Sequence, residues 1–133
     1  MIPQKYEVKY YSLEKEADMI QQFAENCASD DVNVLVDKLN DLNHYLARTA
    51  VMLAEAKMIQ DKSLYDAYMA YHSTGMQMPA SAVNKMIAST CGEANMLVNW
   101  IDRLNRMLVH IGENMRTQIS FNKEQLKLTR SGY

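Results

Sequence analysis

Apolar residues recur along most of the chain at alternating steps of three and four, the spacing that places them on one face of an α-helix. The longest such stripe lies between residues 32 and 74, a stretch of 43 residues without Gly or Pro. A helix through all of it extends roughly 65 Å at 1.5 Å per residue. The stripe comprises Val32, Leu35, Leu39, Leu42, Leu46, Thr49, Leu53 and Ala56.

A second long stripe follows after a short connection. Gly75 predicts the end of the first long helix, and Pro79 predicts the start of the next one. Gly92 and Gly112 lie inside this next stripe, where each costs about 1 kcal/mol relative to Ala, a cost that packing along a long helix offsets. We therefore expect one continuous helix with the stripe Val83, Ile87, Thr90, Ala94, Leu97, Ile101, Leu104, Leu108, Ile111 and Met115.

Two long helices with a 3.5-residue repeat and a short connection lie antiparallel, as in a coiled coil. A shorter helix precedes them: Ser12 offers an N-cap, and apolar residues follow from Leu13 to Cys27 at steps of four and three. The cluster Ser29-Asp30-Asp31 is expected to cap the first long helix. The predicted fold class is therefore all-α, a long antiparallel helical hairpin plus a shorter N-terminal helix.

The two ends of the chain show different patterns. Residues 5–11 alternate apolar and charged side chains with period two, which predicts an extended arm or short strand over residues 1–11. Beyond Met115 the stripe loosens, and we expect residues 127–133 to fray. The helical bundle domain is accordingly expected over residues 12–126.

Large apolar residues flank each seam at intervals of seven, which makes each apolar face wider than one neighbouring helix covers. The first helix, roughly 25 Å long, shields less than half of a 65 Å hairpin. We therefore expect oligomerisation to complete the bundle, as a homodimer or a dimer of dimers. The predicted oligomer interface consists of Tyr45, Met52, Ile59, Met86, Trp100 and Met107.

Composition indicates the cellular compartment in which the chain is expected. Its longest apolar runs are only a few residues, so no membrane span is expected, and the amino terminus lacks a basic flank leading into an apolar run. We expect a cytoplasmic protein without membrane contact. Cys27 and Cys91 fall in apolar stripes and suit reduced thiols, with an interhelical disulfide as the alternative.

Charge is distributed unevenly along the chain. Residues 12–31 hold six acids and one lysine, a net charge of −5, whereas residues 103–133 hold six bases and two acids, a net charge of +4. The basic end could follow nucleic-acid phosphates, or it could neutralise the acids of the first helix within the chain or across a dimer. The bases proposed for partner binding are Arg103, Arg106, Arg116, Lys123 and Lys127.

Aromatic residues and methionines cluster near the expected tip of the hairpin, where Met76 and Met78 also lie. Tyr and Met are enriched at protein interfaces, and tyrosine rings also stack on unpaired bases. The third interpretation is that these side chains simply close the open end of the bundle. The residues proposed for partner binding are Tyr65, Tyr68, Met69, Tyr71 and His72.

No residue pattern specifies a reaction: the chain has no Gly-rich phosphate loop, no CxxC pair and no HExxH. One metal-site hypothesis joins Asp41 and His44 of the first long helix to His110 and Glu113 of the second. The heptad register places all four side chains on outward positions, whereas ligands of a bundle metal point inward. We therefore expect neither an enzyme nor a cofactor.

The amino-acid sequence of the last long helix is distinctive. It contains Trp100-Ile101-Asp102-Arg103-Leu104-Asn105-Arg106, then Met115-Arg116-Thr117-Gln118-Ile119-Ser120. With Ala54-Glu55-Ala56-Lys57, these segments resemble small helical proteins of bacteriophages and integrated elements, often encoded among recombination and single-strand-binding genes. The resemblance covers residues 45–125, and Ile111-Gly112 departs from the polar residues expected there. It implies a phage-derived origin and work near DNA or a host factor, but no catalytic residue.

These observations favour a non-enzymatic, oligomeric helical protein of phage or prophage origin that binds a macromolecule. Its partner is expected to be nucleic acid or a host protein, which makes it a recombination accessory or an inhibitor of a host system. A metal-dependent helical-bundle enzyme and a purely structural, self-assembling subunit are the alternatives.

Overall fold

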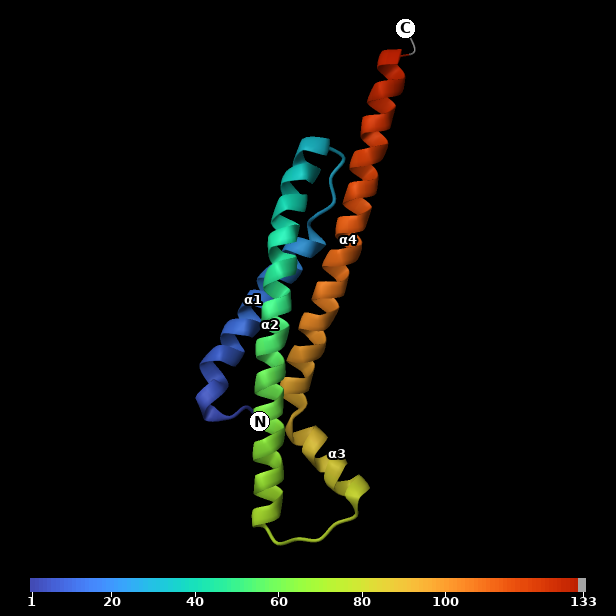
Figure 1. The fold of residues 1–133 in the computed structure, drawn as a ribbon. Helices are drawn as coiled ribbons and strands as arrows, with labels where there is room; N and C mark the ends of the chain where they lie inside the picture. The colour runs from blue at the N-terminus through green and yellow to red at the C-terminus, as the bar shows by residue number, and fades with distance from the viewer. Residues whose placement is uncertain (132–133) are drawn as a thin grey trace.

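The computed structural model describes residues 1–131, and all regular structure within that range is helical (Figure 1). The two longest helices lie side by side and antiparallel, which confirms the predicted all-α hairpin. A 3₁₀ turn leads into the helices, whose order is η1 (Gln4–Tyr6), α1 (Glu7–Glu25), α2 (Val32–Ser73), α3 (Ala80–Thr90) and α4 (Gly92–Ser131).

The ends of α2 have the chemistry that the sequence predicts. Asp31 is the N-cap, and its Oδ1 accepts a hydrogen bond from the backbone N–H of Asn33 at 2.9 Å. At the other end Gly75 has a φ of 67°, a backbone conformation that glycine adopts without steric cost. These two residues fix the bounds of a helix that extends roughly 63 Å.

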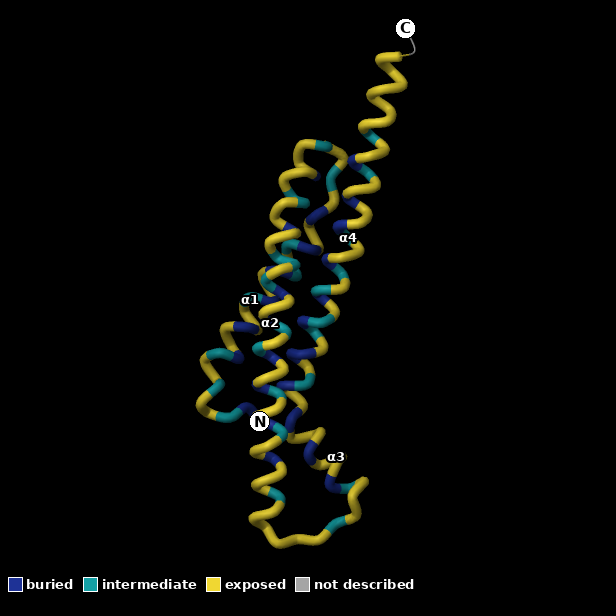
Figure 2. Tube along the Cα trace, in the orientation of Figure 1, coloured by how far each residue is buried: buried dark blue, intermediate teal, exposed yellow. Residues whose placement is uncertain are grey.

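The main core lies between α2 and α4 and beneath α1, which packs along both helices (Figure 2). Leu42, Ile59, Ile101 and Leu108 are fully buried there. The middle of the molecule is therefore a three-helix bundle within one chain. The buried residues of α1 are Tyr10, Leu13, Ala17, Ile20 and Ala24.

Hydrogen bonds between side chains also join α2 to α4 across the seam. Asn105 donates a hydrogen bond from Nδ2 to the fully buried Thr49 Oγ1 at 2.9 Å, and Thr49 donates to the Leu46 carbonyl. Nearer the tip, Gln60 Nε2 donates to Asn95 Oδ1 at 2.7 Å. Because a sliding helix would leave these polar groups without partners, the contacts favour one register of the hairpin.

The predicted strand or extended arm is wrong for residues 4–11, because a 3₁₀ turn occupies Gln4–Tyr6 and helix α1 already begins at Glu7. Ser12 therefore lies inside α1 and is not its N-cap. The apolar stripe of α1 reaches back to Tyr6 and Tyr10 at the same steps of three and four, so these residues share a face with Leu13. Tyr10 is buried and its hydroxyl donates to the Glu93 carbonyl at 3.3 Å. A strand here would lack a neighbouring strand, whereas a helix buries this face.

The expected continuous third helix is also wrong, because it divides at Cys91 into α3 and α4. Cys91 departs from helical geometry, with φ −95° and ψ 15°, and Gly92 follows it. The Thr90 carbonyl there accepts a hydrogen bond from the Met1 nitrogen. As a result α3 turns away from the axis of α4 (Figure 1) and covers a small second core of Ala67, Val83, Ile87 and Cys91.

The predicted fraying of residues 127–133 is wrong for residues 127–131, which continue α4, while residues 132 and 133 lie outside the described range. No Gly or Pro lies between Glu113 and Ser131, so the helical hydrogen bonds continue without a break. The end of α4 extends past the start of α2 (Figure 2), and residues 123–131 are exposed.

Candidate interaction surfaces

An apolar groove, here called the tip groove, lies between the end of α2 and α3. Its volume is about 240 Å³. The groove exists because α3 diverges from α2 and because small alanine side chains face the space between the two helices. Its lining consists of Ala67, Ala70, Tyr71, Thr74, Met76, Met78, Met86, Ile87 and Thr90.

Tyr71, one of the predicted partner-binding residues, forms part of the wall of this groove. Its half-buried ring packs against the small core, and its hydroxyl accepts a hydrogen bond from the Met78 backbone N–H at 3.2 Å. This contact fastens the loop after α2 to the body of the helix. The part of Tyr71 that a partner can reach therefore belongs to a fixed wall.

The other predicted tip residues lie on a different face of α2. Tyr65, Tyr68 and Met69 are 62%, 39% and 52% exposed, and His72 is also exposed. Steps of four and three place Tyr65, Met69 and His72 on one side of the helix, away from Ala67. The structure thus separates the predicted cluster into a groove wall and an outward face.

The predicted basic residues of α4 are all exposed. Arg116, Lys123 and Arg130 follow one another at intervals of seven and so form a row along the helix. The basic residues of α4 make few polar contacts. Arg116 Nη2 donates to Asn43 Oδ1 at 3.3 Å, and Lys127 Nζ lies 3.6 Å from Glu124 Oε1. Nearer the middle of α4, Arg106 Nη2 lies 3.1 Å from Asp102 Oδ2.

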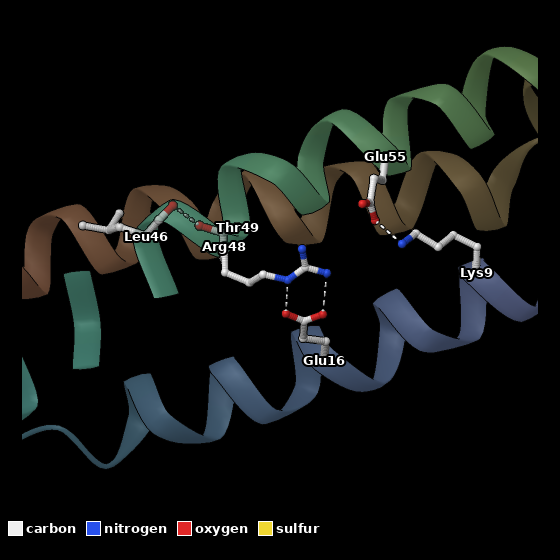
Figure 3. Close-up of polar contacts among 6 residues, drawn as sticks. All are labelled: Lys9, Glu16, Leu46, Arg48, Thr49 and Glu55. Carbon is white, nitrogen blue, oxygen red and sulfur yellow. Dashed lines mark hydrogen bonds and ion pairs between the residues drawn. The ribbon is translucent and has the colours of Figure 1, made fainter. Parts of the chain in front are cut away.

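The two ion pairs that join α1 to another helix both go to α2 (Figure 3). Arg48 of α2 binds Glu16 through Nε and Nη2, and its Nη2–Oε1 distance is 2.9 Å. Lys9 Nζ lies 2.7 Å from Glu55 Oε2. Within residues 1–131 no ion pair joins α1 to α4. The interpretation in which the basic end neutralises the first helix within the chain is therefore wrong.

The predicted oligomer interface is wrong for Met52 and Ile59, which are fully buried in the main core. Tyr45 packs against Phe23 of α1, with ring centroids 4.8 Å apart and the ring planes tilted by 54°. Trp100 Nε1 donates to Gln21 Oε1, also on α1. The physical reason is that α1 packs against both long helices and covers this side of the hairpin.

The remaining two residues of that interface lie elsewhere. Met107 is half-buried and packs against the main core. Met86 is 38% exposed and lines the tip groove instead of flanking the long seam, because the helix breaks at Cys91.

The residues of the metal-site hypothesis are exposed on the outer sides of their helices. His110 Nδ1 lies 3.6 Å from Glu113 Oε2, a contact within one turn of α4. Among the residues that the structure describes, no group of three or more His, Cys, Asp or Glu side chains is arranged to hold a metal ion.

Both cysteines are buried free thiols, as the reduced-thiol prediction expects. Burial raises the pKa of Cys27 and of Cys91 above the ordinary value, and Cys27 Sγ also donates to the Phe23 carbonyl at 3.1 Å. A raised pKa lowers the thiolate fraction at neutral pH, so neither residue has the environment of a cysteine nucleophile.

Comparison with known proteins identifies no relative, since no family model, curated protein or solved structure matches the chain. In the described residues, no helix combines the length and the apolar character needed to cross a lipid bilayer.

Proposed function

We propose that this chain is a non-enzymatic helical protein of phage or prophage origin that binds another protein at its tip groove. The apolar, methionine-rich lining of the groove is the observation that supports this proposal. The expected setting is the cytoplasm, where the bound protein belongs to the host or to a recombination system and is inhibited or assisted by the contact.

The dimensions of the groove suit side chains of a protein partner. Small-molecule sites usually enclose about 300–1,000 Å³, which is larger than the 240 Å³ found here. A partner helix or loop that inserts one or two apolar side chains needs less space. Met76 and Met86 are 59% and 38% exposed, and their flexible thioether side chains adapt to different partner surfaces.

Photocrosslinking in the producing cells tests this proposal. A benzoylphenylalanine at Met86 is expected to crosslink to one discrete protein, whereas the same residue at Met96, 66% exposed on α4, is not. Ala70→Trp fills the groove from its α2 wall and is expected to remove the crosslink while preserving the helical circular dichroism. Equal crosslinking from both positions, or a crosslink that survives Ala70→Trp, contradicts the proposal.

Nucleic-acid binding is a second candidate, and the free end of α4 is the observation that favours it. Arg116, Lys123 and Arg130 repeat about every 10.5 Å along the helix, and Lys127 lies on the same exposed segment. Such a row can contact successive phosphates, and its affinity then falls steeply as salt rises.

Fluorescence anisotropy with single- and double-stranded DNA at about 50 and about 200 mM salt tests this second candidate. Binding is expected at the lower concentration and is expected to weaken at the higher one. The Lys123→Glu, Arg130→Glu double variant should lose it, while Lys85→Glu on α3 should not. Absence of binding at low salt excludes this candidate and leaves the tip groove proposal unaffected.

A further inference from the structure

The outward face of α2 carries a second, mostly apolar pattern, distinct from the buried seam. Its residues also follow alternating steps of four and three, and every one of them is exposed. Val51 is 48% exposed, Met58 44% and Tyr65 62%. We call this set the outer α2 seam, and it comprises Ala47, Val51, Ala54, Met58, Asp61, Tyr65, Tyr68 and His72.

The outer face of α4 has no comparable pattern. Along the solvent side of its middle part, the residues at the same steps of four and three are polar or charged after the exposed Met96. They are Asn99, Arg103, Arg106, His110 and Glu113. A surface helix normally presents such residues to water. The outer α2 seam is therefore unusual within this molecule, and its sustained 3.5-residue repeat is the pattern that packs against another helix.

The order of side-chain sizes along this seam identifies its occupant. Residues 47–54 of the seam are small and residues 65–72 are large, with the middle of the seam between Met58 and Asp61. We infer that a second copy of this chain docks here with its α2 antiparallel. Ala47 then faces His72 of the second copy, Val51 faces Tyr68 and Ala54 faces Tyr65.

Antiparallel pairing places each small side chain opposite a large one along roughly 39 Å of helix. Parallel pairing would instead place Ala54 against Ala54 and Tyr65 against Tyr65, which leaves gaps at one end and crowding at the other. The two-fold axis of the antiparallel pair makes the contact self-complementary, as a closed dimer requires.

Charges near the middle of the seam agree with this arrangement. Asp61 comes level with Met58 of the second copy, and Lys57 is the neighbour of Met58 on the same exposed side. The symmetry therefore produces two Asp61–Lys57 pairs, one on each side of the axis. Within residues 1–131 neither Asp61 nor Lys57 has an ion-pair partner in its own chain.

This surface is separate from the tip groove, so the inference does not rest on the proposed function. Sedimentation equilibrium over a concentration series is expected to show a dimer for the natural chain. Val51→Glu should shift it to monomer, and Tyr68→Glu should do the same from the other half of the seam. Met96→Glu, the same new charge on exposed α4, should leave the dimer intact.

Circular dichroism checks that each variant retains its helices, as expected for exposed positions. A natural chain that remains monomeric throughout the series overturns the inference. A dimer that persists in both Val51→Glu and Tyr68→Glu overturns it as well, because the second copy then occupies another face.

Disulfide trapping tests the orientation of the two copies. When Ala54→Cys and Tyr65→Cys chains are mixed under mild oxidation, a mixed disulfide is expected, since the inferred pairing brings these positions together across the interface. Ala54→Cys alone should give none. A disulfide between two Ala54→Cys chains indicates parallel pairing and overturns the inferred arrangement.

Discussion

Replacing Ile59 by alanine tests whether α1 covers the hairpin within a single chain. The Ile59 side chain is fully buried in the core that α1 shares with α2 and α4. Truncating a buried isoleucine to alanine removes its apolar burial and leaves a cavity, at a cost of about 2–5 kcal/mol. For a chain of 133 residues, a loss of about 3 kcal/mol lowers the melting temperature by about 10 °C.

Urea unfolding monitored by Trp100 fluorescence measures this loss. Trp100 is the single tryptophan, and its hydrogen bond to Gln21 makes its emission sensitive to the docking of α1. The control is Val8→Ala, because Val8 is 85% exposed on α1 and should change the free energy of unfolding by no more than about 0.5 kcal/mol. Dilute protein keeps any self-association from contributing.

Two outcomes distinguish burial of Ile59 within one chain from a position in an interface between copies. A large loss of stability that does not depend on protein concentration supports burial within the chain. If Ile59→Ala instead leaves the unfolding of dilute protein unchanged and abolishes self-association, then Ile59 lies in an interface between copies and the reasoning given for α1 is refuted.

Three further predictions concern polar and titratable groups. Thr49→Val should lower the free energy of unfolding in urea by about 1–3 kcal/mol, because it removes the fully buried hydroxyl that accepts a hydrogen bond from the half-buried Asn105. Burial, aided by the Glu14 and Glu93 carboxylates, raises the pKa of the Tyr10 hydroxyl to about 12. As pH rises, the unfolded chain therefore loses this proton before the folded chain does, and the free energy of unfolding should fall above pH ~10. The fall should be steeper in the natural chain than in Tyr10→Phe. An Ellman's reagent assay should show Cys27 and Cys91 reacting slowly in the folded protein and rapidly in urea, and equal rates would contradict their burial.

The regular stripes made the hairpin predictable. Leu35, Leu42, Ile101, Leu104 and Leu108 were expected on the inner faces of two long helices, and the structure buries all of them. The Asp31 cap and the Gly75 stop were predictable for a similar reason, since each acts through its own backbone or nearest neighbours.

Features that depend on contacts between distant segments were harder to predict. Alternation over residues 5–11 fits a strand, yet Tyr6 and Tyr10 also extend the helical stripe of α1, and only the packing of α1 on the hairpin decides between the two. The interface predicted at Met52 and Ile59 was wrong because α1 packs on both long helices and shares one core with them. The break at Cys91 does not follow from the helix propensity of Gly92, because the cost of one glycine is small enough for a long packed helix to offset.

The tip groove required that break, since a straight helix through Gly92 would have kept Met86 along the seam. Its sequence signals were the small Ala67 and Ala70 beside the methionines, but small residues also suit a close helix contact. The spacing of the outer α2 seam follows from the sequence, but its exposure does not: the structure leaves every residue of the seam exposed among residues 1–131.

The small core beneath α3 is separate from the main core, and only Ala67, Val83, Ile87 and Cys91 are buried in it. Regions with few buried apolar contacts open at a lower free energy than the whole protein. We therefore expect amide hydrogens of α3 to exchange in partial opening events that leave the main bundle folded. The chain then contains two cooperative units of unequal stability, and a partner that closes on the tip groove would slow exchange in the weaker unit alone.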